Sequence, residues 1–274
     1  MGLLATVVPM QQTSLRVLAV GATGSVGGQV VARALERGHR VRALVRRADQ
    51  AHSLPGQVET VIADLTAPET LAAAVEGVDA VVFTHGTHPV DATLPESVDY
   101  GGVRNVLTAI GDRPVRIALM TAIGVTDRQG AYNRTTQAHD WKRRAERLVR
   151  ASGHPYTIVR PGWFDYNSAD QHNLVFLQGD RRRTGSPRDG VIARAQIGQV
   201  LVDSLTSPAA AGKTLELVAE HGPAQTDLDP LFAALVPDGP DRLDGALDED
   251  TMPLESEPVG VRAELARIRA HAHR

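Results

Sequence analysis

The sequence predicts an α/β protein with a doubly wound parallel sheet and a small C-terminal elaboration on the side where a substrate would enter. Two observations predict this fold class. From residue 15 to residue 160, short apolar segments alternate with segments whose apolar residues recur at helical spacing. A glycine-rich turn, GATGSVGG, joins the first apolar segment to the first helical one. With 274 residues and 42% apolar content, the chain is long enough to bury a substantial core.

The elements follow one another in a regular order. A strand at residues 15–20 precedes the glycine-rich turn and a helix that places Val26, Val30 and Leu35 on one face. A second strand at residues 40–45 completes a βαβ unit. Further strands are expected at residues 58–63, 80–84, 116–120 and 156–160, with helices between them at residues 68–75, 96–110 and 136–152. These six strands predict a parallel sheet with helices on both faces.

The pattern changes after Pro161. Shorter segments follow, with a helix expected at residues 195–205 and a strand at residues 214–218. The tail combines an acidic stretch at residues 238–250 with a helical pattern around Leu265, and it is expected to form either a flap or an interface.

The domain organisation follows from these patterns. We expect a flexible leader at residues 1–14 and one domain at residues 15–274, in which residues 161–274 supply the substrate-side cap and the tail.

Composition excludes several classes of protein. The net charge is −3 and acidic and basic residues are interspersed, so no positive field would attract nucleic acid or acidic lipid. The chain has no cysteine, which excludes disulfides, thiolate metal sites and a cysteine nucleophile. Ten histidines show no HxxxH or HExxH spacing, so no metal site is expected. We expect a cytoplasmic monomer or homodimer without a nucleic-acid or membrane partner.

The glycine-rich turn is typical of a diphosphate-binding loop. Gly21, Gly24 and Gly27 lie between a strand and a helix, where a diphosphate approaches the backbone too closely for a Cβ atom. The helix N-terminus adds free amide groups and a partial positive charge. A simple tight turn is the alternative. The residues expected to contact the diphosphate are Gly21, Thr23, Gly24, Ser25, Val26 and Gly27.

The end of the second strand indicates which nucleotide is bound. An NAD site usually has an acidic residue there to hold the ribose diol, whereas this strand ends in Arg46 and Arg47. A guanidinium group would pair with the 2′-phosphate of NADP. We therefore predict NADP(H) rather than NAD(H), with Arg46 as the discriminating residue. A solvated basic loop is the alternative.

Two more strand ends lie at the same edge of the predicted sheet. Asp64 and Leu65 follow the third strand, where the adenine ring lies in this architecture, although Asp64 could instead cap a helix. Thr84, His85 and Gly86 end the fourth strand and are expected near the nicotinamide ribose, with packing as the alternative for His85.

Several motifs together resemble the atypical short-chain dehydrogenase/reductases, in particular the NmrA-like, NAD(P)H-binding branch. The resemblance covers residues 15–218 and is carried by GATGSVGG, VDYGGVRNVL, IALMTAIGV, HDWKRRAERL and SGHPYTIVRPGW. It implies a Rossmann-type fold that holds NAD(P)H. Members of this family include quinone and isoflavone reductases, and also regulators that sense the cofactor without catalysis.

The resemblance also implies a catalytic site, in which this chain departs from the usual pattern. Ordinary members of the wider superfamily use serine, tyrosine and lysine, with YxxxK on one helix face. Here Lys142 matches the lysine, but Ala138 stands at the tyrosine position, and Thr121 is the one hydroxyl after the fifth strand. Lys142 is expected to steady the ribose and the developing charge, or else to form a surface ion pair with Glu146.

A different proton donor is then needed. Tyr132, on the loop expected before the Lys142 helix, is the best substitute, and the other possible donors are His85, His139 and Tyr166.

The sixth strand ends in a segment expected to border the substrate. Pro161 and Gly162 would lie against the nicotinamide, and Trp163, Phe164 and Tyr166, with His85, would line an apolar acceptor pocket. Core packing is the alternative for these aromatic residues, and a turn is the simplest role for Asp165.

The sequence thus predicts an NADP(H)-dependent oxidoreductase that transfers hydride to a small apolar acceptor such as a quinone or enone. The alternative is a non-catalytic NADP(H) sensor, and an epimerase or dehydratase is a weaker third possibility because it needs a tyrosine-based acid and base. The basic clusters at residues 142–144 and 181–183 are interpreted as solvated surface.

Overall fold

The computed structural model describes residues 14–87 and 93–272 of the chain. Of the leader expected at residues 1–14, all but Ser14 lies outside the described residues. The strands of the main sheet are β1 (Arg16–Val20), β2 (Arg40–Val45), β3 (Glu59–Ile62), β4 (Ala80–Phe83), β5 (Arg116–Met120), β6 (Tyr156–Pro161), β8 (Asn173–Leu177) and β10 (Lys213–Glu220).

These eight strands are arranged in the order β3-β2-β1-β4-β5-β6-β10-β8. All neighbours pair in parallel except β8, which pairs antiparallel with β10. The doubly wound parallel sheet is therefore confirmed. The sheet has two strands more than the six predicted. β10 pairs with β6, and β8 pairs with β10 and is the edge strand. A second, two-stranded sheet pairs β7 (Trp163–Phe164) with β9 (Val191–Ile192).

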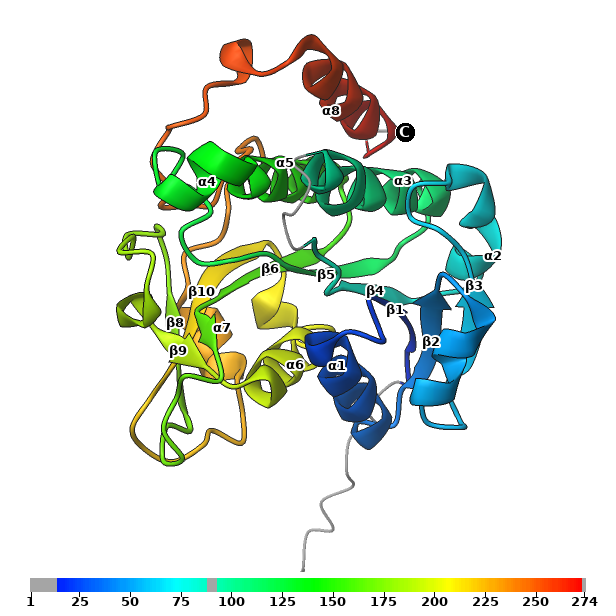
Figure 1. The fold of residues 1–274 in the computed structure, drawn as a ribbon, viewed down its shortest axis with the longest axis horizontal. Coiled ribbons are helices and arrows are strands. Elements are labelled where there is room, and N and C mark those ends of the chain that lie inside the picture. Colours follow the sequence, from blue (N-terminus) through cyan, green and yellow to red (C-terminus); the bar gives the residue numbers. More distant parts are fainter. Residues whose placement is uncertain (1–13, 88–92, 273–274) are drawn as a thin grey trace, which may run out of the picture.

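Helices cover both faces of the sheet (Figure 1). One face carries α3, α5 and, beyond them, α8, while α1 and α6 lie on the other face. The helices are α1 (Ser25–Glu36), α2 (Ala72–Val75), α3 (Gly101–Ile110), α4 (Ala131–Thr136), α5 (Ala138–Ala151), α6 (Arg194–Asp203), α7 (Asp229–Ala234) and α8 (Val259–Ala272).

The two faces have separate apolar cores, and β1 shows how one strand serves both. Leu18 and Val20 are fully buried in the core beneath α3 and α5, whereas Val17 and Ala19 belong to the core beneath α1 and α6. Successive side chains of a strand point to opposite faces, so a strand buried on both sides is apolar throughout. This is why the strands appear as continuous apolar runs in the sequence.

The helix expected at residues 136–152 is confirmed as α5 (Ala138–Ala151), and a short helix that was not expected, α4 (Ala131–Thr136), precedes it. Gln137 adopts a left-handed conformation, with φ of 54°, and separates α4 from α5. Its amide donates to Asn133 O at 2.7 Å, and the Asn133 side chain accepts from the amide of Asp140 at 3.1 Å, which caps the new helix. Tyr132 was expected on a loop, and this was wrong, because it lies within α4.

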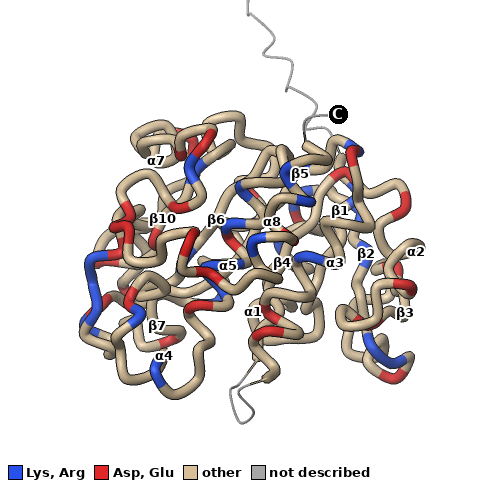
Figure 2. The backbone as a smooth tube through the Cα atoms, turned by 90° about the horizontal axis from the view of Figure 1, so that it is seen from above, with Lys and Arg blue, Asp and Glu red and all other residues tan. Residues whose placement is uncertain are grey.

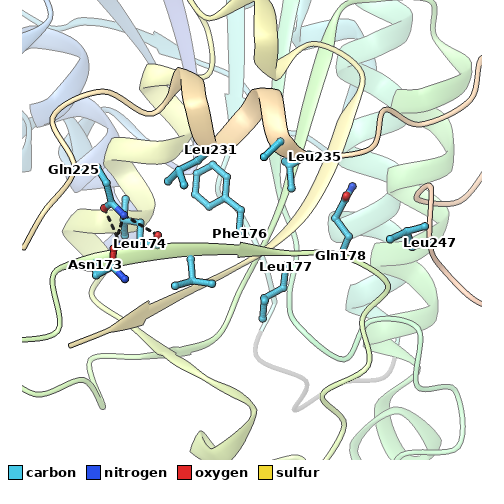
Figure 3. A pocket seen from close by; sticks show the side chains of 11 residues that line it. Asn173, Leu174, Phe176, Leu177, Gln178, Gln225, Leu231, Leu235 and Leu247 are labelled. Atoms are coloured by element: carbon cyan, nitrogen blue, oxygen red, sulfur yellow. Dashed lines mark hydrogen bonds between the residues drawn. The ribbon is translucent and has the colours of Figure 1, made fainter. Parts of the chain in front are cut away.

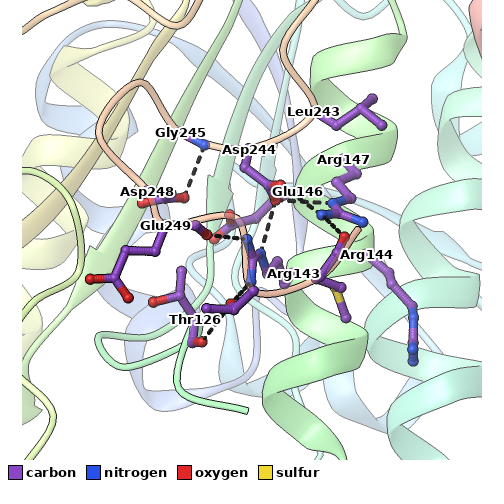
Figure 4. A network of polar contacts seen from close by, with 12 residues as sticks. Thr126, Arg143, Arg144, Glu146, Arg147, Leu243, Asp244, Gly245, Asp248 and Glu249 are labelled. Atoms are coloured by element: carbon purple, nitrogen blue, oxygen red, sulfur yellow. Dashed lines mark hydrogen bonds and ion pairs between the residues drawn. The ribbon is translucent and has the colours of Figure 1, made fainter. Parts of the chain in front are cut away.

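The acidic tail packs against α5 of its own chain. Arg143 and Arg144 were expected on a solvated surface, and this was wrong, because Arg143 is fully buried and Arg144 is 7% exposed. Arg143 Nε donates to Asp244 Oδ1 at 2.9 Å, and Arg144 Nε donates to Glu257 Oε2 at 2.6 Å. Arg147 adds a second cation to Asp244 (Figure 4). A polar helix face that looks solvated in sequence is therefore covered by a segment about 100 residues further along the chain.

Charged residues of both signs are interspersed over the backbone (Figure 2). Within residues 14–87 and 93–272, no helix has the length and apolar content required to cross a bilayer.

Candidate functional site

The turn between β1 and α1 is folded tightly enough to require glycine. Gly21 has φ of +88°, and a Cβ atom there would lie 2.7 Å from the backbone nitrogen of His85. A Cβ on Gly27 would overlap the carbonyl oxygen of Gly21. Thr23 and Ser25 are exposed beside the first-turn amides of α1. This bare backbone at a helix N-terminus fits the diphosphate of a dinucleotide.

The end of β4 meets this turn directly. Thr84 donates its hydroxyl hydrogen to Val20 O at 3.1 Å, which ties β4 to the end of β1. His85 Nε2 lies 3.1 Å from Val98 O. Burial, aided by the charge of Lys142, lowers the pKa of His85 to about 4, so the ring is neutral at pH 7. Because a carbonyl oxygen can only accept, the proton is on Nε2.

His85 Nδ1 is consequently an acceptor, and it is buried without a partner among the residues that the structure describes.

Lys142 lies at the same edge. Its ammonium group pairs with Asp99, and Asp99 in turn accepts from the Thr87 hydroxyl at 2.5 Å. A Cβ on Gly86 would be 3.3 Å from Lys142 Nζ, so the absence of a side chain there leaves space beside the ammonium group. The alternative ion pair of Lys142 with Glu146 is wrong, because Glu146 is fully buried and bound to Arg150 and Arg160.

Sequence reasoning missed Asp99. It lies in the π-helical segment Pro95–Tyr100, 43 residues before Lys142, and its side chain is 2% exposed. The VDYGGVRNVL motif that contains Asp99 was available as a signal.

The rings of Tyr132 and His139 contact each other at a tilt of 56° beside this ion pair. Their ring centroids are 4.9 Å apart, and Tyr132 is 46% exposed. Burial and then the charge of Asp99 raise the pKa of Tyr132, which keeps the phenol protonated at neutral pH. Burial and then Lys142 lower the pKa of His139. The structure thus brings a phenol, an imidazole and an ammonium group together at one edge of the sheet.

Arg46 is exposed at the tip of β2. Its neighbour Arg47 is engaged in an ion pair with Asp49 at 3.0 Å, which leaves Arg46 as the freer cation. Asp64 forms a turn cap, since one carboxylate oxygen accepts from the Thr66 amide at 2.8 Å and from the Thr66 hydroxyl at 2.7 Å. These two bonds, together with the charge of Arg46, lower the pKa of Asp64.

Leu65 packs on the start of α3, where a Cβ on Gly102 would lie 3.2 Å from Leu65 Cδ1.

Thr121 points into a buried ion network. Its hydroxyl donates to Glu146 Oε1 at 2.7 Å. Arg160, which is fully buried, donates to Glu146 Oε2 at 2.7 Å and to Asp248 Oδ2 at 2.6 Å. This contact does not favour Thr121 as a catalytic hydroxyl, because its hydrogen is committed to Glu146.

The backbone groups of Pro161 and Gly162, where β6 ends, form hydrogen bonds within the fold. Pro161 O accepts from the Ile123 amide at 3.1 Å, and Gly162 N donates to Leu217 O at 2.9 Å. A Cβ on Gly162 would lie 2.5 Å from Gly190 O. Both backbone groups are therefore used within the fold, and the glycine is required by close packing against Gly190.

The aromatic residues Trp163, Phe164 and Tyr166 follow β6. Arg194 contacts Phe164 and also donates to Ser25 at the glycine-rich turn. Trp163 and Tyr166 form an edge contact with centroids 6.1 Å apart, and the Arg194 guanidinium lies 5.2 Å from the centroid of Phe164. Asp165, in a left-handed conformation with φ of 58°, accepts from the Arg194 amide at 3.1 Å and pairs with its side chain. Asp165 therefore holds the start of α6, a more specific role than the turn expected.

A separate groove lies between β8 and α7, at the far edge of the sheet from β2 (Figure 3). Its volume is about 540 Å³. It is lined by Asn173, Leu174, Phe176, Gln225, Leu231 and Leu235. None of these residues belongs to the site predicted from the sequence.

Comparisons with known proteins agree with this geometry. A family model described as NAD(P)H-binding matches residues 21–208. An Arabidopsis thaliana protein described as uncharacterized protein At2g37660, chloroplastic, is 30% identical over 229 residues, 75% of this chain and 70% of its own length. Sanguinarine reductase of Eschscholzia californica is 28% identical over 262 residues, 80% of this chain and 95% of its own length.

A solved structure from Bacillus halodurans, described as an NAD-dependent epimerase/dehydratase, has a TM-score of 0.65 at 26% identity. The match covers 77% of this chain and 96% of that one.

Proposed function

The chain belongs to the NAD(P)H-binding family, and from this premise we propose that it is an NADP(H)-dependent oxidoreductase that transfers hydride to a small apolar acceptor of the quinone or enone type. The family match confirms the resemblance to atypical short-chain dehydrogenase/reductases. A relative that aligns over most of both chains is named as a reductase, which supports reduction as the reaction.

One observation carries the proposal: the position of Lys142. Its ammonium group lies beside Gly86 at the end of β4, and β4 is the neighbour of the strand that leads into the glycine-rich turn. Asp99 holds the ammonium group in place. A fixed cation in a partly dry site stabilises negative charge that develops on an acceptor oxygen.

The chemistry divides between the cofactor and the protein. A bound nicotinamide supplies the hydride. Lys142 stabilises the charge on the reduced acceptor, and Tyr132, kept protonated beside His139, supplies the proton at its phenolic oxygen. The acceptor need not receive this proton from the YxxxK position, where Ala138 is buried.

The aromatic segment supports an apolar acceptor. Tyr166 is 64% exposed and Trp163 is partly buried, so both rings present flat apolar area to solvent on the side of the sheet where β7 lies.

The test of this proposal is turnover. Purified protein is mixed with NADPH and a panel of quinones and enones, with aldehydes as a comparison set, and the loss of NADPH absorbance is recorded. We expect rates above the protein-free blank for the quinones or enones and lower rates for the aldehydes. Protein that binds NADPH by calorimetry but oxidises it no faster than the blank across the panel would overturn the proposal in favour of the non-catalytic sensor.

We further propose that the cofactor is NADP(H), because Arg46 is an exposed cation at the tip of β2. Arg46→Glu is expected to weaken NADPH binding by roughly tenfold or more and to change NADH binding little, because the new repulsion acts on the 2′-phosphate alone. Calorimetric titration with both nucleotides measures this. Arg47→Glu is the matched control, since Arg47 is already paired with Asp49. Equal losses for NADPH and NADH in Arg46→Glu would rule out Arg46 as the discriminator.

A further inference from the structure

We infer that Arg194 binds the diphosphate of the nucleotide alongside the glycine-rich turn, an inference that rests on the nucleotide binding of the proposed function. Arg194 is the first residue of α6 and lies 169 positions after Ser25 in the sequence. Its Nε donates to Ser25 Oγ at 3.0 Å, which places a guanidinium group directly at the first turn of α1.

The packing of α1 on α6 explains why this residue is at the turn. A Cβ on Gly198 would lie 2.9 Å from the backbone of Gln29, so the two helices approach at backbone distance. Ser25 and Gln29 are one helical turn apart on α1, and their contacts Arg194 and Gly198 are one turn apart on α6. The helices therefore run parallel, and both N-termini point to the edge of the sheet that carries the glycine-rich turn.

The guanidinium group is fixed in orientation and still has donors to offer. Asp165 pairs with Nη1, and Ser25 accepts from Nε. The remaining terminal nitrogen, Nη2, has no hydrogen-bond partner in the described part of the chain. The side chain is 34% exposed, so an anion can reach it. A planar guanidinium group that is already oriented binds a phosphate through parallel hydrogen bonds.

The position of Arg194 selects the diphosphate rather than the 2′-phosphate. Ser25 lies on the first turn of α1, where the amide groups and the helix dipole favour the diphosphate. Arg46, by contrast, lies at the tip of β2, where the adenine ribose is expected. Arg194 should consequently act on groups that NADH and NADPH share.

The experiment compares nucleotide fragments by calorimetry. Arg194→Ala is expected to weaken the binding of NADPH, NADH and ADP-ribose by a similar factor of roughly tenfold, because each loses charge-assisted hydrogen bonds to its diphosphate. Adenosine 2′-monophosphate, which has the 2′-phosphate but no diphosphate, should bind as tightly as it does to the wild type. Arg194→Lys should recover part of the loss, since it keeps the charge without the planar fork.

The matched control is Arg33→Ala. Arg33 also joins α1 to α6, through Asp203 at 2.7 Å, but at the opposite ends of the two helices. It should leave all four affinities unchanged.

Unchanged NADPH and NADH affinity in Arg194→Ala would overturn the inference. An equal loss for adenosine 2′-monophosphate, or an equal loss in Arg33→Ala, would also overturn it by showing that helix packing is responsible. If the wild type binds nucleotides but oxidises none of the acceptors, the proposed reaction fails while the role of Arg194 stands. If the wild type binds no nucleotide, both fail.

Discussion

Arg160→Met is expected to lower the free energy of unfolding by about 3–5 kcal/mol, the usual cost of removing one partner from a buried ion pair. Arg160 is fully buried and is the shared cation of Glu146 and Asp248, whose side chains are 0% and 1% exposed. Without it, both carboxylates stay in the interior without their main counter-charge. Equilibrium urea unfolding measures the loss.

The pH dependence of this loss has a defined sign. Burial favours the neutral carboxyls, but Arg160 outweighs it and holds the pKa of Glu146 and of Asp248 below the ordinary values. A depressed carboxyl pKa contributes stability above the unfolded pKa of about 4, and that contribution is lost as the pH falls through the folded pKa. The difference in free energy of unfolding between the wild type and Arg160→Met should therefore be largest near neutral pH and should become smaller in acid.

Glu216 affects the pH dependence of stability in the opposite direction. Burial raises its pKa to about 8, although Arg160 opposes this shift. A raised carboxyl pKa gives stability that is complete below the unfolded pKa and is lost as the pH rises toward about 8. The contribution of Glu216 to wild-type stability should accordingly decline between about pH 4 and about pH 8, against the gain from Glu146 and Asp248.

Two further variants make this prediction testable even if Arg160→Met folds poorly. Arg160→Lys keeps the positive charge but not the planar set of guanidinium donors, so it should lower the free energy of unfolding less than Arg160→Met does. Arg188→Met removes an arginine that is exposed on the turn Pro187–Asp189 and should change stability by less than about 0.5 kcal/mol. If Arg160→Met changes the free energy of unfolding as little as Arg188→Met does, the assignment of Arg160 as the main counter-charge is contradicted. The same holds if the difference between Arg160→Met and the wild type stays constant in acid.

Lys142→Met is expected to lower kcat by about 100-fold with the acceptor that the panel identifies, because a positioned charge stabiliser of this kind contributes two to three orders of magnitude. NADPH affinity should fall less than kcat, since the glycine-rich turn and Arg46 remain. Steady-state kinetics combined with calorimetry separates the two effects.

A double variant separates catalysis from structure. Lys142 also neutralises Asp99, which is almost fully buried, so Lys142→Met by itself leaves an uncompensated carboxylate. Lys142→Met/Asp99→Asn removes both charges. If Lys142 acts only by neutralising Asp99, the double variant should recover the wild-type kcat. If it stabilises charge on the acceptor, kcat should stay low while the melting temperature recovers. Recovered kcat would refute the catalytic role.

The sequence alone was sufficient for the features that depend on neighbouring residues. The strands β1 to β6 and the helices α1 and α6 follow from apolar spacing over four to twelve residues, and GATGSVGG marks the turn between β1 and α1. Backbone geometry decides these features locally. A positive φ at Gly21 and a Cβ-free contact at Gly27 require glycine whatever the rest of the chain does.

Only the tertiary structure could decide which charges meet. Asp99 and Lys142 are 43 residues apart, and Ser25 and Arg194 are 169 apart, so neither pair leaves a spacing to detect. The same holds for Arg143, which looks solvated on α5 until the distant tail covers it. Local patterns report whether one face of an element is apolar. The partner of a polar group depends on how whole elements pack, and that is determined by the burial of all of them together.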